Sequence, residues 1–178
     1  MMILKKLKTA APFIMLFLLL SMLWHELYSA SSSKYSSSMS GEQLPSFSLP
    51  TLTGKTLSAH SLRGHVSILN VFATWCSACN AEHNMMMRIK NEYHVPIYGI
   101  LYRDNGEEAS RWLANKGNPY VMVGNDARGA TGADLGIVGT PKTFVIGPDG
   151  RILYQHTGVV DQSLWENDIY PIIKQYAR

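Results

Sequence analysis

Cysteine is scarce in this 178-residue chain, which contains only Cys76 and Cys79. Two cysteines are too few for a disulfide-rich scaffold, and they exclude a structural zinc site with four cysteine ligands. Charged side chains are also few, at 16%, whereas hydrophobic side chains make up 46%. This composition excludes disorder over most of the chain, and the length predicts one folded domain.

The chain has no excess of positive charge beyond its first eight residues. The formal net charge is +3, and Lys5, Lys6 and Lys8 account for it. The remaining sequence is close to neutral and lacks the basic character of a surface that contacts nucleic-acid phosphates. We therefore expect no nucleic-acid partner.

The three lysines precede an uncharged apolar run from Ala10 to Trp24. A positive end followed by an apolar run is typical of an export signal. The run has a length of about 15 residues, between that of a cleaved signal and that of a full membrane span. Cleavage near residues 29–31 is one alternative. We favour an uncleaved signal-anchor over residues 1–28, which would carry the rest of the chain across the membrane.

A serine-rich stretch follows at residues 29–40 and contains eight serines. Such a stretch cannot bury a core and is expected to form a flexible linker. The pattern becomes globular from Gly41 onward, which predicts a folded domain over residues 41–178.

Strand-like and helix-like segments alternate along this domain. Apolar β-branched runs predict strands, and capping residues and glycines predict helices between them. A leading hairpin is expected around the Thr53–Gly54 turn. The later strands are expected at 66–73, 95–101, 120–123, 142–146 and 151–155. Helices are expected at 76–92, at 107–116 and from Ser163 onward. Asp104 is expected to cap the second of these helices, and Pro171 is expected to kink or interrupt the last one. Short right-handed connections then make an α/β fold with a central mixed sheet and helices on both faces.

Cys76 and Cys79 stand where an apolar strand gives way to a helix. Residues three apart on a helix lie close enough for a disulfide bond. The first sulfur would lie near the free N–H groups of the helix N-terminus, which favour a thiolate. We therefore expect an exposed nucleophilic Cys76 and a shielded resolving Cys79 that exchange disulfides with a partner.

Two other uses of the cysteine pair remain open. A structural disulfide would close a very small ring and would remove little entropy from the unfolded chain. A copper(I) site could combine both cysteines with His83, helped by the methionines at 85–87, because Cu(I) prefers soft sulfur ligands. Three consecutive methionines point around a helix, however, and are more typical of core and surface packing.

The stretch TWCSACNAEH at residues 74–83 resembles the active-site segment of thioredoxin-like proteins. The stretch GTPKTF at residues 139–144 resembles their cis-proline loop. With WLANKGNPY and LGIVGTPKTFVI, the chain from about residue 41 to its end resembles the thiol:disulfide interchange proteins of cytochrome c maturation, the CcmG/DsbE family. The resemblance implies a thioredoxin-like fold with an N-terminal hairpin extension.

The resemblance also implies a function. Members of this family are membrane-anchored periplasmic proteins of the bacterial inner membrane. They reduce the haem-binding Cys-x-x-Cys-His segment of apocytochrome c within the cytochrome c maturation machinery. A membrane electron donor of the DsbD type regenerates them. Their redox centre is the cysteine pair itself, here Cys76 and Cys79, without a further cofactor or metal.

Four more residues are candidates for the site. Pro141 corresponds to the cis-proline, and Thr140, Pro141 and Trp75 are expected to contact substrate. Glu82 corresponds to an acidic active-site residue. It lies one helical turn after Cys79, so it is expected to take the proton of that thiol, and an exposed helix carboxylate is the alternative. Asn70 stands where ordinary thioredoxins carry a buried acid.

The sequence departs from the family pattern at several positions. Ser77 and Ala78 stand between the cysteines where Pro-Thr is common. Lys142 replaces an acidic residue, and Val138 replaces a frequent tyrosine. We expect these changes to make the rim of the site less acidic and to affect substrate preference.

Several functions compatible with the cysteine pair remain as alternatives. One is a general periplasmic thiol reductant or oxidant, since the direction of electron flow depends on both redox potentials. A copper(I)-delivery module and a chaperone that binds apocytochrome are the alternatives that involve binding alone. The segment at residues 45–64 is similar to thiol peroxidases, but the second cysteine of the pair disfavours that class.

Overall fold

A computed structural model describes residues 15–22 and 40–176. The chain divides into two units between Tyr35 and Ser36. Residues 15–22 are helical, and no helix of the described residues has both the length and the apolar character needed to cross a membrane. Most of the expected signal-anchor and almost all of the expected linker lie outside the described residues.

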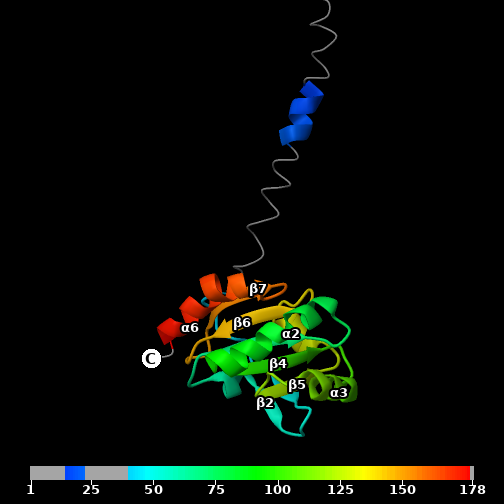
Figure 1. The fold of residues 1–178 in the computed structure, drawn as a ribbon, viewed down its shortest axis with the longest axis vertical. Coiled ribbons are helices and arrows are strands. Elements are labelled where there is room, and N and C mark those ends of the chain that lie inside the picture. The colour runs from blue at the N-terminus through cyan, green and yellow to red at the C-terminus, as the bar shows by residue number, and fades with distance from the viewer. Residues whose placement is uncertain (1–14, 23–39, 177–178) are drawn as a thin grey trace, which may run out of the picture. The chain divides into compact units, whose positions relative to one another are not determined.

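The second unit is built on a five-stranded mixed sheet with the order β5-β4-β3-β6-β7 (Figure 1). The strands β3, β4 and β5 run parallel, and β6 and β7 are antiparallel to their neighbours. The strand bounds are β3 Ser67–Phe72, β4 Ile97–Tyr102, β5 Met122–Asp126, β6 Lys142–Ile146 and β7 Ile152–Thr157. The structure thus confirms the predicted mixed sheet.

The central strands are buried along their whole length. Every residue of β3 and of β4 is buried, as is typical of parallel strands covered on both faces. Gly99 of β4 faces the rings of Phe72 and Tyr120, where an added Cβ would lie within 3.1 Å of both rings. The absence of a side chain at Gly99 therefore lets two aromatic rings pack directly on the sheet.

Helices cover both faces of the sheet. One core contains residues of α2 (Ser77–Arg88), α3 (Gly106–Lys116) and the C-terminal helical segment, and includes Met86, Leu113 and Trp165. The other face is covered by the hairpin of β1 (Ser48–Pro50) and β2 (Thr56–Ser58), by the 3₁₀ turn η1 (Ala59–Leu62) and by the segment after α4 (Ala130–Asp134), which contributes Leu135 and Ile137. The predicted N-terminal hairpin is therefore present and contributes Leu49 and Leu57 to the core.

Several helix ends differ from the sequence prediction. The N-cap of α3 is Asn105, whose side chain accepts hydrogen bonds from the backbone N–H groups of Glu107 and Glu108. The carboxylate of Asp104, which was expected to cap this helix, is turned to another loop.

The last helical segment is capped by Asp161 instead of Ser163. It comprises α5 (Gln162–Leu164), the π-helical turn η3 (Trp165–Ile169) and α6 (Tyr170–Tyr176). Pro171 is the second residue of α6, which continues past it to Tyr176. A second π turn, η2 (Ile89–Tyr93), extends α2.

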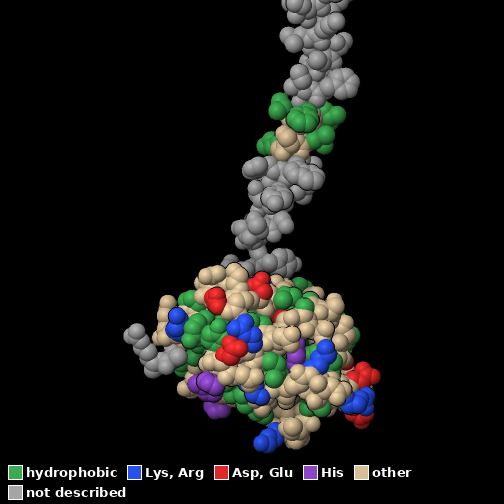
Figure 2. Space-filling view, viewed as in Figure 1, with side chains coloured by type: hydrophobic (Ala, Val, Ile, Leu, Met, Phe, Trp, Pro, Cys, Tyr) green, Lys and Arg blue, Asp and Glu red, His purple; other side chains and the backbone are tan. Residues whose placement is uncertain are grey.

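The surface of this unit carries mixed charge on the face shown in Figure 2. Basic and acidic side chains lie between apolar and uncharged ones on that face, without one continuous patch of either sign. This arrangement agrees with the near-neutral composition of the chain beyond its first residues.

Candidate active site

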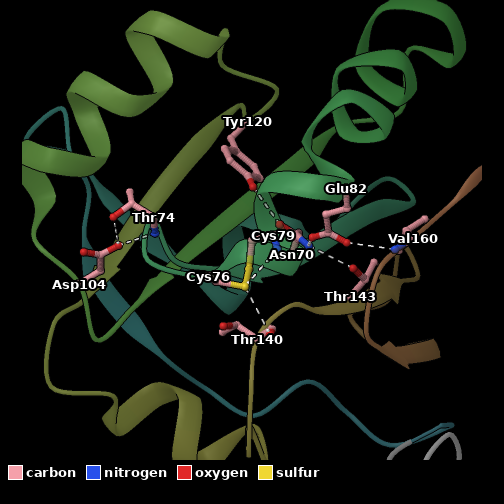
Figure 3. The surroundings of a disulfide bond; sticks show 10 residues. All are labelled: Asn70, Thr74, Cys76, Cys79, Glu82, Asp104, Tyr120, Thr140, Thr143 and Val160. Carbon is pink, nitrogen blue, oxygen red and sulfur yellow. Dashed lines mark hydrogen bonds between the residues drawn. A yellow bond between two sulfur atoms is a disulfide. The ribbon is translucent and has the colours of Figure 1, made fainter.

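The two cysteines lie at the junction of β3 and α2, as the sequence predicts. The strand β3 ends at Phe72, and Cys76 is the N-cap of α2 in an extended backbone conformation. A disulfide bond joins Cys76 to Cys79, whose Cα atoms are 5.3 Å apart. The backbone N–H of Cys79 donates to Cys76 Sγ at 3.0 Å (Figure 3). The first sulfur thus occupies the position at which a helix N-terminus stabilises negative charge.

The expectation of an exposed Cys76 is wrong for this oxidised form. Cys76 is 6% exposed and Cys79 is 3% exposed, so both are buried. The loop before β6 covers the first sulfur, because Thr140 O lies 3.5 Å from Cys76 Sγ. The Thr140–Pro141 peptide bond is cis. The predicted proline loop therefore lies directly against the disulfide.

The segment that leads into Cys76 is fixed by the loop after β4. Asp104 Oδ2 accepts two hydrogen bonds from Thr74, from the backbone N–H at 2.6 Å and from Oγ1 at 2.8 Å. Trp75 Nε1 donates to Arg103 O at 3.2 Å, although the indole remains 61% exposed. Trp75 is therefore an exposed but oriented aromatic surface beside the cysteine pair. Asp104 was not predicted as part of the site.

Glu82 is buried in α2, one turn after Cys79. Its side chain is 2% exposed and accepts hydrogen bonds from Asn70 Nδ2 at 2.9 Å and from Val160 N at 3.1 Å. Burial raises the pKa of Glu82 to about 7, and these two hydrogen bonds act in the opposite direction. The exposed-carboxylate alternative is therefore wrong, and the carboxyl group titrates near neutral pH.

Asn70 connects this carboxylate to two further side chains. Its Nδ2 also donates to Thr143 Oγ1 at 3.1 Å, and its Oδ1 accepts from the Tyr120 hydroxyl at 2.8 Å (Figure 3). Asn70 and Thr143 have no exposed surface, and Tyr120 is 6% exposed. Sequence reasoning missed Tyr120, Thr143 and Val160, whose positions in the chain give no local signal of this contact.

Among the described residues, no three His, Cys, Asp or Glu side chains are grouped so that they could hold a metal ion, and this includes the residues of the alternative copper site. His83 is 4% exposed, because its ring packs edge-on against Trp112 at 4.5 Å between centroids. Its Nε2 lies 3.3 Å from Lys116 O, and burial lowers the pKa of this imidazole. Met85 and Met86 are buried in the core beneath α2.

The two departures beside the proline loop have different surroundings. Val138 is 77% exposed and forms part of the rim, as expected. Lys142 is only 7% exposed, its Nζ lies 3.4 Å from Gly136 O, and burial lowers its pKa. Lys142 therefore contributes little exposed charge to the surface of the site.

The fold and the site together define a class of protein. A disulfide between cysteines three positions apart, at the start of a helix and against a cis-proline loop of a mixed sheet, is the arrangement of a thioredoxin-fold thiol:disulfide oxidoreductase. In agreement with this class, the Redoxin family model matches residues 39–171.

Individual relatives narrow the class. The thiol:disulfide interchange protein DsbE of Pseudomonas aeruginosa is 37% identical over 145 residues, 80% of each chain. The protein of the same name from Pseudomonas fluorescens is 41% identical over 134 residues, 75% of each chain. The crystal structure of a thiol:disulfide interchange protein of the thioredoxin family from Chlorobium tepidum has a TM-score of 0.62 and 26% identity, covering 80% of this chain and 99% of its own. The chain belongs to the DsbE family of thiol:disulfide interchange proteins within the redoxins.

Proposed function

We propose that this thiol:disulfide oxidoreductase reduces the disulfide of the haem-binding Cys-x-x-Cys-His segment of apocytochrome c. The observation that supports the proposal best is the position of the cysteine pair at the N-terminus of α2 against the cis-proline loop. Membership of the DsbE family supports the pathway, cytochrome c maturation. The reaction needs no cofactor beyond the Cys76–Cys79 pair.

Cys76 is the nucleophile in this proposal. As a thiolate, its Sγ attacks one sulfur of the substrate disulfide and forms a mixed disulfide, and the other substrate sulfur leaves as a thiolate. The Cys79 N–H and the helix N-terminus stabilise the Cys76 thiolate before attack. Cys79 then attacks Cys76 Sγ, which releases the substrate as a dithiol and leaves the Cys76–Cys79 disulfide.

Glu82 takes the proton of Cys79 in the second step, directly or through a water molecule. Its position one turn further along α2 and its pKa of about 7 suit a group that accepts a proton near neutral pH. Its fixed hydrogen bonds with Asn70 and Val160 hold the carboxylate in one place.

The substrate peptide lies in extended form between Trp75 and the proline loop. Trp75 offers an exposed apolar face, and backbone groups beside Pro141 can pair with an extended chain because proline has no N–H of its own. Thr140 O, which contacts Cys76 Sγ in the oxidised form, lies at the point where the substrate sulfur must enter.

The proposed location is the periplasmic side of a bacterial inner membrane. Residues 1–28 act as a single-pass signal-anchor, and the serine-rich residues 29–40 act as a tether for the domain over 41–178. A membrane electron donor of the DsbD type returns the Cys76–Cys79 disulfide to the dithiol form.

The test is a trapping experiment with the Cys79→Ser variant. This variant should accumulate a mixed disulfide with an oxidised Cys-x-x-Cys-His peptide, because no second thiol releases it. Cys76→Ser should trap nothing, and a Ser-x-x-Ser-His peptide is the matched substrate control.

A second measurement compares the redox potential of the Cys76–Cys79 pair with that of the Cys-x-x-Cys-His peptide. A potential well above that of the peptide would mean that the protein oxidises this segment. Equal trapping of unrelated disulfide peptides would indicate a general thiol reductant. Absence of any trapped species would contradict the exchange mechanism.

A further inference from the structure

Every side-chain polar group of Asn70 has a partner. The two Nδ2 hydrogens go to Glu82 Oε1 and Thr143 Oγ1, and Oδ1 accepts the Tyr120 hydroxyl. The asparagine cannot turn its amide over without exchanging donor and acceptor at Glu82, and a carboxylate can only accept. The orientation of the Asn70 side-chain amide therefore decides whether Glu82 Oε1 faces an N–H donor or the amide oxygen.

Thr143 does not fix that direction, because a hydroxyl group donates and accepts equally well. Tyr120 fixes the orientation of the Asn70 amide, provided that its hydroxyl donates to Asn70 Oδ1. The phenol stays protonated, because burial raises the pKa of Tyr120 well above the ordinary value. Its ring is held by stacking on Phe72 at 4.7 Å between centroids. Tyr120 is thus a rigid donor that keeps the Asn70 amide turned toward the carboxylate.

We infer that Tyr120 is a positioning residue for thiol:disulfide exchange. Through Asn70, it holds Glu82 in the ionised form that accepts the proton of Cys79. This inference rests on the proposed role of Glu82. The inference adds Tyr120 to the site. This residue lies in the segment before β5, and its hydroxyl is hydrogen-bonded to Asn70 and not to either cysteine.

The charged groups of the neighbouring elements are turned to other partners. His83 of α2 faces Lys116 O, and Lys142 of β6 faces Gly136 O. On β7, His156 lies opposite Thr143 in the sheet register. Its imidazole interacts with the backbone of Val159, and burial lowers its pKa. Asp161, next to Val160, caps α5. The Asn70 and Val160 hydrogen bonds are thus the contacts that favour the ionised form of Glu82 against its burial.

The test is Tyr120→Phe in the full-length protein in detergent, with the exchange rate measured against pH. The phenyl ring keeps the stack on Phe72 and removes only the donor. We expect the rise in rate near pH 7 to move to higher pH. The rate should fall about threefold to tenfold at pH 7 and recover at high pH, since one pKa unit corresponds to a tenfold change in the ionised fraction. Tyr98→Phe, whose hydroxyl lies 3.4 Å from His65, is the matched control and should keep the wild-type profile.

Two further measurements separate the possible failures. Glu82→Gln should remove the rise near pH 7, and the double variant with Tyr120→Phe should behave like Glu82→Gln alone. If Glu82→Gln keeps the wild-type profile, the proposed role of Glu82 is wrong. If Glu82→Gln removes the rise and Tyr120→Phe leaves it in place, the inference about Tyr120 is overturned. A carboxyl ¹³C titration of Glu82 in oxidised Tyr120→Phe gives the same answer without turnover, and an unshifted midpoint there contradicts the inference.

Discussion

Burial and ionisation act against each other at Glu82. The unfolded chain would titrate this carboxyl near its ordinary value of 4.5, whereas the folded chain titrates it at about 7. Since the folded state binds the proton more tightly, protonation favours folding. The associated stability is fully present below pH 4.5 and is lost as the pH rises through 7. The difference between the two values corresponds to about 3 kcal/mol.

Glu82→Gln should therefore flatten the dependence of stability on pH. The free energy of unfolding of the wild-type protein should fall between pH 4.5 and 8 by about 3 kcal/mol more than that of Glu82→Gln, because the amide cannot ionise. Urea denaturation of the oxidised protein at several pH values measures this difference. The exposed Glu108→Gln is the control and should follow the wild type. Parallel curves for Glu82→Gln and wild type would contradict the assigned pKa.

The loop after β4 serves two elements at once. Asn105 caps α3, while Asp104 next to it accepts the hydrogen bonds of Thr74 in the loop after β3. Asp104 Oδ1 also accepts the Asn105 N–H at 2.7 Å. Two loops that follow neighbouring parallel strands are thus joined by one carboxylate, and the joined loop carries Trp75 and Cys76.

Asp104→Ala should loosen this junction. We expect a loss of about 1–3 kcal/mol in the free energy of unfolding, because the Thr74 N–H loses a charged acceptor. The rate of disulfide exchange should also fall, since the loop that carries Trp75 and Cys76 is no longer held in one position relative to the peptide. Urea denaturation and peptide exchange measure the two effects. The exposed Asp134→Ala is the control, and equal stability of both variants would contradict the structural role of Asp104.

The fixed contacts of the folded domain begin at its first described residues. Ser40 Oγ donates to Leu153 O, Gly41 N donates to Ile152 O, and Gln43 pairs with Arg151. These bonds attach the start of the domain to β7 and its preceding turn. The bonds of Ser40, Gly41 and Gln43 thus fix the start of the domain to its own sheet.

Removal of residues 1–28 should release the protein from the membrane without loss of exchange. The truncated chain is expected in the soluble fraction, and its rate with a soluble Cys-x-x-Cys-His peptide should match that of the full-length protein. Fractionation with carbonate extraction and the peptide assay measure these properties. Membrane retention of the truncated chain, or extraction of the full-length chain by carbonate, would contradict the proposed anchor.

The amino-acid sequence by itself determined the cysteine pair at a strand-to-helix junction, the mixed sheet, the leading hairpin and the proline loop. The cysteine pair, the sheet and the hairpin rest on local patterns of hydrophobicity, turn residues and spacing, whereas the proline loop follows from the resemblance of residues 139–144 to the cis-proline loop of thioredoxin-like proteins. Tertiary structure alone decided the buried state of Cys76, the environment of Glu82 and the role of Asp104. Thr140, Tyr120, Thr143, Val160 and Asp104 lie between 30 and 78 positions from the residues they contact here. Such contacts exist only after the sheet has brought distant strand ends together, because hydrogen bonds and desolvation depend on proximity in space.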